Sequence, residues 1–291
     1  MNRILRLILC LGVNALSSFA QSVSVEILAD QENFLAHEQL ELKVRITNFS
    51  GQTLTLGQDD DWLTLAVEGK KNYIVSKLAS VPVQGEFSLE SSTAGTRRVD
   101  LAPHFDLSRP GHYTVTATVK IPQWQRTVIS KPTAFNIITG TSIWEQEFGI
   151  PNRTQQTTGV PEIRKFELLQ AHHLKEMKLY LRISDSSGTV FGVFPIGPLV
   201  SLSKPEPQLD KFSNLHVLYQ VGAKSFSYSV VSPDGLYIAR EAYDINQTRP
   251  ALHSREDGRI TVAGGKRRIS ANDLPPPVSS TQTSDAKPPQ P

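Results

Sequence analysis

Two polar clusters have residue types that could bind a metal ion. Asp59-Asp60-Asp61 could supply carboxylate oxygens to calcium, and His172-His173 could supply two imidazole ligands. The acidic run lacks the spaced carboxylates and the distal glutamate of a dedicated calcium loop, and neighbouring residues of a strand point to opposite faces. We therefore interpret the aspartates as a solvated loop and the histidines as surface or interstrand residues, and we predict neither a metal ion nor a cofactor.

A third polar cluster, His104 and Asp106, would face one side of a strand, but two residues complete neither a catalytic triad nor a metal site. The sequence contains no Gly-x-Ser-x-Gly, no His-Glu-x-x-His and no glycine-rich phosphate loop. Carboxylate pairs for glycoside hydrolysis cannot be recognised from spacing, because their members come from different strands. The sequence therefore identifies no catalytic residue.

Aromatic side chains are dense between residues 219 and 243. The set comprises Tyr219, Phe226, Tyr228, Tyr237 and Tyr243. Several of them on one exposed face could stack on a sugar or a peptide, and the alternative is cross-strand packing in a small β core. We name Tyr219, Tyr228 and Tyr237 as the candidate binding face.

The charge balance argues against nucleic acid as a partner. The 291 residues carry a formal charge of +2, from 30 basic and 28 acidic side chains. Arg3 and Arg6 lie in the first twenty residues, which contain no acid, so 30 − 2 = 28 basic residues balance 28 acidic ones in the remainder. Lys266-Arg-Arg268 is a small basic run, which we interpret as a charged edge that protects a terminal hairpin against aggregation. A neutral chain has no electrostatic reason to bind a polyanion.

Residues 1–20 are typical of a signal peptide. Arg3 and Arg6 precede the apolar run Ile4–Val13, and Ser18-Phe19-Ala20 offers small residues for cleavage after Ala20. The apolar run is too short to span a bilayer, so we expect no stable membrane anchor. The single cysteine, Cys10, would be removed with this segment, which excludes disulfides from the mature chain. We predict a secreted or periplasmic protein of bacterial type.

The elements that would position these side chains are predicted to be strands. The longest alternation runs from Tyr113 to Ile121, after a corner at Pro110-Gly111, and predicts the central strand of a β-sandwich. About seven short strands separated by turns, with no helical period, extend over residues 22–140. Trp62 is a candidate for the core of this domain.

The segment Pro110-Gly-His-Tyr-Thr-Val115, with Ile46-Thr-Asn48 upstream, resembles the immunoglobulin-like domains common in bacterial secreted and surface proteins. The resemblance covers residues 22–140. It implies a structural corner at Gly111 and Tyr113, where the tyrosine hydroxyl bonds back to the backbone. The sequence departs from antibody-type domains at Val115, where those domains have a cysteine.

Residues 141–272 alternate in the same way and predict a second antiparallel β domain, a meander folded as a sandwich or an open barrel. At about 130 residues this region is too short for a closed propeller. Residues 273–291 are rich in proline, serine, threonine and glutamine and predict a disordered tail. The predicted fold class is therefore all-β.

These features favour an exported, non-catalytic binding or assembly module that engages a protein or a glycan through loops or a strand edge. A periplasmic pilus-type chaperone is one specific variant, although the sequence shows no pair of basic residues for its cleft. The alternatives are a carbohydrate-active or other hydrolytic enzyme with an unrecognised site, and a sandwich-type protease inhibitor that uses the long loop Lys77–Ser92.

Overall fold

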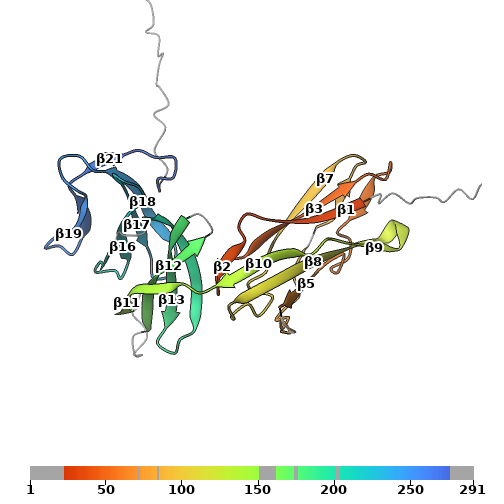
Figure 1. Cartoon of the computed structure of the whole chain (residues 1–291), viewed down its shortest axis with the longest axis horizontal. Helices are drawn as coiled ribbons and strands as arrows, with labels where there is room; N and C mark the ends of the chain where they lie inside the picture. The colour runs from red at the N-terminus through yellow and green to blue at the C-terminus, as the bar shows by residue number, and fades with distance from the viewer. Residues whose placement is uncertain are drawn as a thin grey trace, which may run out of the picture.

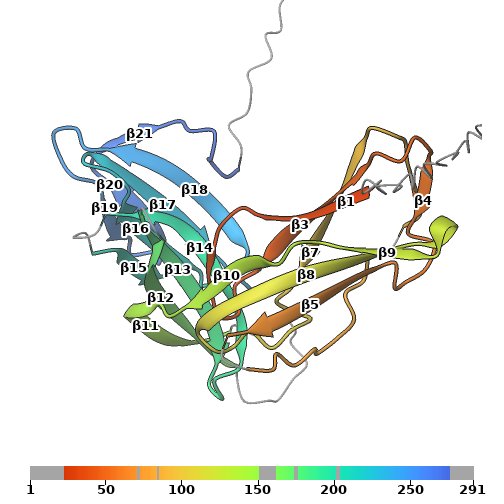
Figure 2. The ribbon, with the colours of Figure 1, turned by 45° about the vertical axis from the view of Figure 1, so that its right-hand side comes forward.

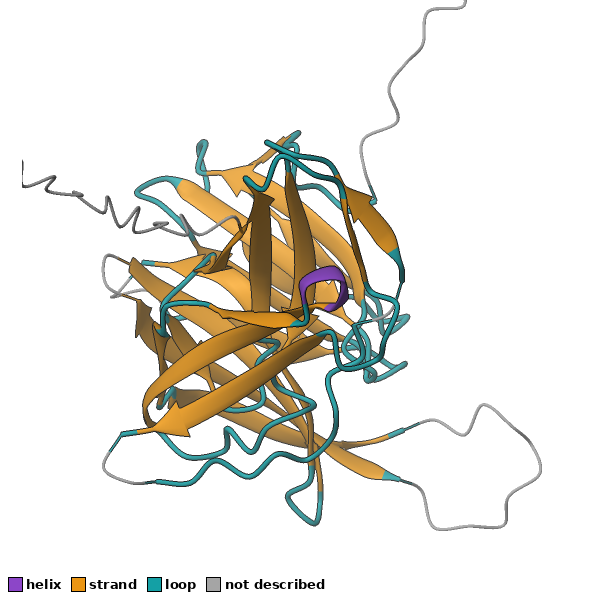
Figure 3. Ribbon diagram, turned by 90° about the vertical axis from the view of Figure 1, so that its right-hand side faces the viewer, coloured by secondary structure: helices purple, strands orange, loops and turns teal. Residues whose placement is uncertain are grey.

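The computed structural model describes residues 23–70, 73–83, 85–150, 162–173, 176–200 and 204–275. Over these ranges the chain is all-β, as predicted, and its helical element is one 3₁₀ turn, η1 (Pro122–Trp124) (Figure 3). The predicted signal peptide and residues 276–291 of the predicted tail lie outside the described residues. The strands of residues 23–138, the first half, pair among themselves, as do those of residues 141–275, the second half (Figure 1).

The first half contains two main sheets. The three strands of one sheet are, in order, β1 (Val23–Ala29), β3 (Glu41–Asn48) and β7 (Ala94–Asp100). The strands of the other are, in order, β2 (Asn33–Leu35), β10 (Thr133–Ile138), β8 (Gly111–Ile121) and β5 (Leu63–Gly69), with β9 (Arg126–Ile129) also paired to β8. β8 therefore has partners on both sides, which confirms the predicted central strand.

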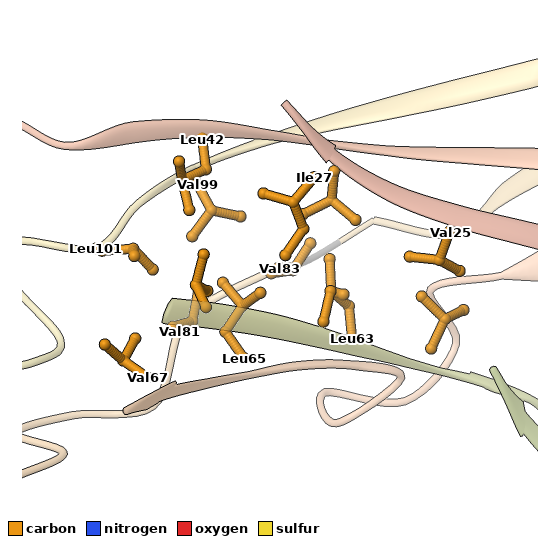
Figure 4. Packing of buried hydrophobic residues seen from close by; sticks show 14 of the residues in the cluster. Val25, Ile27, Leu42, Leu63, Leu65, Val67, Val81, Val83, Val99 and Leu101 are labelled. Atoms are coloured by element: carbon orange, nitrogen blue, oxygen red, sulfur yellow. The ribbon is translucent and has the colours of Figure 1, made fainter. Parts of the chain in front are cut away.

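The core of the first half lies between these sheets (Figure 4). Alternate residues of each strand point inward, so Leu42 and Val99 from one sheet face Leu63 and Leu65 from the other. Trp62 is 1% exposed, and its indole Nε1 donates to the Val83 carbonyl at 2.8 Å. A small sheet of β4 (Leu54–Leu56) and β6 (Phe87–Leu89) completes this half.

The second half is a sandwich of two meanders, which agrees with the predicted antiparallel arrangement. One sheet has the order β11 (Thr141–Gly149), β12 (Ile163–His173), β13 (Glu176–Asp185) and β14 (Val190–Leu199). The other has the order β15 (Glu206–Leu209), β16 (Leu215–Gln220), β17 (Ser225–Val231), β18 (Tyr237–Asp244) and β21 (Lys266–Arg268). Phe166, Leu181, Val217 and Val231 are buried between the two sheets.

A third layer covers the outer face of the β15–β21 sheet. The hairpin β19 (Ala251–Ser254) and β20 (Ile260–Ala263) contributes Leu252 and Val262 to a cluster with Leu218, Phe226 and Tyr228. Both faces of this sheet are therefore apolar. Asp273 and Leu274, which the sequence assigned to the tail, belong to the fold: Asp273 is buried, and Leu274 and Arg240 of β18 exchange two backbone hydrogen bonds.

The two halves meet at the outer face of the β11–β14 sheet (Figure 2). Leu35 of β2 packs in one cluster with Leu169, Tyr180 and Val193 of that sheet. Glu38 is also buried here, and its carboxylate accepts hydrogen bonds from the Leu35 amide at 2.7 Å and from Gln31 Nε2 at 3.0 Å. Burial raises the pKa of Glu38.

A histidine and a tyrosine complete this interface. The Tyr180 hydroxyl and His173 Nε2 lie 2.6 Å apart. Burial raises the pKa of Tyr180, and burial together with the Lys178 ammonium lowers the pKa of His173. The tyrosine therefore stays protonated and the imidazole stays neutral, and the two share a hydrogen bond. His172, the neighbour of His173, is exposed, as expected for adjacent residues of a strand.

Candidate functional site

The three tyrosines of the predicted binding face do not form an exposed surface, so that prediction is wrong. Tyr219 is 2% exposed and Tyr228 is 7% exposed, and Tyr237 is half-buried. Tyr219 belongs to the core between the two sheets, whereas Tyr228 lies on the opposite face, under the β19–β20 hairpin. The physical reason is that both faces of the β15–β21 sheet are covered: the β11–β14 sheet covers Tyr219, and the β19–β20 hairpin covers Tyr228.

Two carboxylates from the other polar clusters of the sequence, Asp61 and Asp106, have local partners. Asp59, Asp60 and Asp61 are exposed, and an ion pair with Lys120 lowers the pKa of Asp61. Asp106 accepts hydrogen bonds from the Ser108 hydroxyl and amide. In the part of the chain that the structure describes, no three His, Cys, Asp or Glu side chains are grouped to hold a metal ion.

The predicted corner and the predicted charged edge also have defined places. The Tyr113 hydroxyl donates to the Arg109 carbonyl at 2.7 Å, which is the contact that the resemblance implied. Gly111 begins β8, and a Cβ there would meet the Tyr113 ring at 3.7 Å, an ordinary contact, so space does not demand a glycine. The Lys266-Arg-Arg268 run forms β21, an exposed edge strand.

A cleft of about 660 Å³ opens at one end of the second half, and we call it the end cleft. It lies between the start of β12 and the turns that join β15 to β16 and β17 to β18. Three large apolar side chains that line it are exposed: Phe212 at 60%, Leu236 at 68% and Ile238 at 49%. Exposed apolar side chains grouped around a concave surface are typical of interaction sites.

The first rim of the end cleft is a tight turn locked by Asp210. Its carboxylate accepts hydrogen bonds from the backbone amides of Phe212 and Asn214, both at 2.8 Å, and from Asn214 Nδ2 at 2.9 Å. Ser213 has a φ of 62°, which lets the chain reverse within four residues. Phe212 is held outward at the tip of this turn.

Asp210 is in turn fixed by buried residues behind it. His216 Nε2 lies 3.2 Å from its carboxylate, and the Tyr228 hydroxyl lies 2.6 Å from His216 Nδ1. Burial lowers the pKa of His216 and raises that of Tyr228 to about 12, so a neutral imidazole accepts from Tyr228 and donates to Asp210. Burial alone would raise the pKa of Asp210, but hydrogen bonds from Asn214 and His216 lower it further than burial raises it.

An Asp–His–Tyr series of this kind has the order of an acid–base relay. His216 and Tyr228 are themselves buried, so neither ring is open to a substrate. The series positions the turn that carries Phe212.

The second rim is the Ser232–Leu236 turn. The Ser232 hydroxyl accepts hydrogen bonds from the amides of Asp234 at 3.3 Å and Leu236 at 3.1 Å. Gly235 has a φ of 83°, and a Cβ there would lie 2.7 Å from the ring of Phe194. Both the backbone angle and the space therefore require glycine. This turn presents Leu236 to the end cleft.

Arg164 bonds to the two carboxylates that line the end cleft. Its guanidinium is 15% exposed and bonds to Glu162 at 2.7 Å, to Asp234 at 2.8 Å and to the Pro233 carbonyl at 2.9 Å. It also covers the ring of Phe191, 4.7 Å from the ring centroid. One arginine and two carboxylates leave the end cleft with one net negative charge beside its apolar side chains.

The sequence indicated the turn at Pro233-Asp-Gly235 but not the role of its neighbours. Phe212 and Leu236 each lie in a tight turn, and a large apolar residue at such a position was the available signal. The convergence of these two turns and the start of β12 at one end of the sandwich depends on tertiary structure.

No described protein family matches this sequence, and no curated protein matches it. Among solved structures it is similar to Spo0M, a sporulation control protein from Bacillus subtilis, with a TM-score of 0.30 and 10% sequence identity. The match covers 59% of this chain and 83% of that one. At this TM-score the likeness carries no argument. Among the described residues, no helix is long and apolar enough to cross a membrane.

Proposed function

We propose that the protein is an exported, non-catalytic binding module that engages a partner protein through the end cleft. The observation that carries the proposal is the exposure of Phe212, Leu236 and Ile238 around one concave surface. The turns that present Phe212 and Leu236 are locked by Asp210 and Ser232, so little conformational entropy is lost on binding. A protein fits this surface better than a glycan, because three large apolar side chains are exposed around it.

The first half supports a scaffold role of the immunoglobulin-like type. Its β1–β3–β7 sheet faces a sheet in which β5, β8 and β10 are neighbours, an order similar to the two sheets of such domains. The hydrogen bond from Tyr113 to Arg109 is the corner contact of that architecture. Export is supported by the basic and apolar pattern of residues 1–20.

Two alternatives have less support. An inhibitor loop must project from the sandwich, but Val81 and Val83 within Lys77–Ser92 are buried in the first core. A hydrolytic enzyme needs an accessible acid–base pair, and the Asp210–His216–Tyr228 series is enclosed by the fold.

Leu236→Asp is expected to reduce partner capture at least tenfold, because a charge would be desolvated in an apolar contact. The measurement is quantitative co-purification from the native cells with tagged full-length protein. Leu78→Asp is the matched control, since Leu78 is 63% exposed but lies in the first half. Unchanged capture by Leu236→Asp, or equal loss with Leu78→Asp, would contradict the proposal.

A further inference from the structure

A second pocket, of about 250 Å³, lies where the two sheets of the second half open at their edges, and we call it the edge pocket. Its walls come from β14 on one side and from β17, β18 and the segment after β21 on the other. The hydroxyls of two tyrosines tie these walls together: Tyr219 donates to the Ile196 carbonyl at 3.1 Å, and Tyr237 donates to the Pro195 carbonyl at 2.7 Å. The edge pocket is therefore a formed feature, separate from the end cleft.

Arg240 supplies an unmatched positive charge to the edge pocket. Its guanidinium lies 4.4 Å from the centroid of the Tyr237 ring. Its Nε is buried, and among the described residues it has no hydrogen-bond partner and Arg240 has no carboxylate within ion-pair distance. The described residues around Arg240 therefore leave part of the hydrogen-bonding capacity of its guanidinium unused.

The acidic side chains around the edge pocket are already engaged. Glu241 accepts from the Tyr243 hydroxyl at 2.6 Å and pairs with Arg267 at 3.4 Å. Asp273 pairs with the same Arg267 at 2.8 Å. The remaining cation of the wall, Arg268, pairs with Asp244 at 3.0 Å. Of the described arginines around this pocket, Arg240 is the one that no carboxylate contacts, and an anion could supply that contact.

We propose that the edge pocket binds the carboxylate of an acidic sugar, a hexuronic acid residue, on Arg240. Arginine is suited to a carboxylate because its planar fork donates two parallel hydrogen bonds. The hydroxyls of Ser227 and Ser270 and the amide of Asn272 also line the pocket, and they match the hydroxyls of a sugar ring. The volume is below the range of pockets for drug-sized ligands, about 300–1,000 Å³, as a single ring requires.

A peptide with a free carboxyl terminus is the competing ligand, and the wall formed by β14 disfavours it. Capture of a peptide at a sheet edge relies on backbone hydrogen bonds along an open strand. Pro195 and Pro198 interrupt β14 at this point and have no N–H to donate. The observations therefore favour the sugar.

The test is a titration of ¹⁵N-labelled protein, in the form left after export, followed by amide chemical shifts. The probes are sodium glucuronate, glucose and N-acetyl-alanyl-alanine. We expect saturable shifts near β14 and β18 with glucuronate and at least tenfold weaker binding of glucose. Arg240→Gln should weaken glucuronate binding at least tenfold, and Arg240→Lys, which keeps the charge and loses the fork, should weaken it less.

Arg255→Gln is the control for bulk charge, because Arg255 is an exposed arginine on the β19–β20 turn. Unchanged glucuronate binding by this variant would support the proposal. Absence of saturable shifts with glucuronate, equal binding by Arg240→Gln, or preference for the dipeptide would each overturn it. If Arg240→Gln does not fold, the wild-type preference for glucuronate over glucose and the Arg240→Lys variant still decide the question.

Discussion

Tyr180→Ala is expected to lower the free energy of unfolding by about 3–5 kcal/mol, the usual cost of removing a large buried ring. Tyr180 is 0% exposed and packs at the contact between the two halves, beside Leu35 and Val193. The substitution also removes the hydroxyl that lies 2.6 Å from His173 Nε2 and shares a hydrogen bond with it. Urea denaturation followed by circular dichroism measures the loss.

Tyr180→Phe separates the contribution of ring packing from that of the hydroxyl hydrogen bond. It keeps the ring and removes the hydroxyl, so we expect a loss of about 1–3 kcal/mol. Limited proteolysis at the joint between β10 and β11 should be faster for Tyr180→Ala than for Tyr180→Phe, because only the alanine variant opens the apolar contact. A change below about 1 kcal/mol for Tyr180→Ala would show that the two halves do not depend on this residue.

Trp62→Ala is expected to cost a similar amount, about 3–5 kcal/mol, in the first half. The substitution empties a site that is 1% exposed and removes the hydrogen bond to the Val83 carbonyl. That bond anchors the segment before β6 to the core, so the segment should become more sensitive to protease.

The measurement is again urea denaturation, with Trp124→Ala as control. Trp124 is half-buried in η1, and its loss should cost about 1 kcal/mol. Equal losses in the free energy of unfolding for Trp62→Ala and Trp124→Ala would contradict the prediction that Trp62 is a main contributor to the core.

Much of the fold was predictable because alternation with a period of two is a local signal. Tyr113 to Ile121 alternate strictly, and the structure places that stretch between β5 and β10. Met177, Leu179, Leu181 and Ile183 gave the same signal for β13, and all four are buried. Turn residues such as Pro233-Asp-Gly235 then separated the strands correctly.

The site was not predictable in the same way, because it depends on which layers cover which faces. Tyr228 alternates with serines and is buried, as that pattern predicts, but the pattern does not show that the β19–β20 hairpin covers it or that it bonds to His216 behind Asp210. Arg240 is an ordinary arginine in the sequence. Its lack of a carboxylate partner follows from how β18 and β14 face one another. Neither property has a local pattern.

Binding of a partner protein at the end cleft is tested most directly by photo-crosslinking from position 212, with a benzoylphenylalanine in place of Phe212. The same group at Ile129 is the control, since Ile129 is 63% exposed and lies in the first half. We predict a discrete adduct with a second protein in the native cells from position 212, lost when Leu236→Asp is added, and no such adduct from position 129. The same adducts from both positions, or none from position 212, would contradict binding at the end cleft.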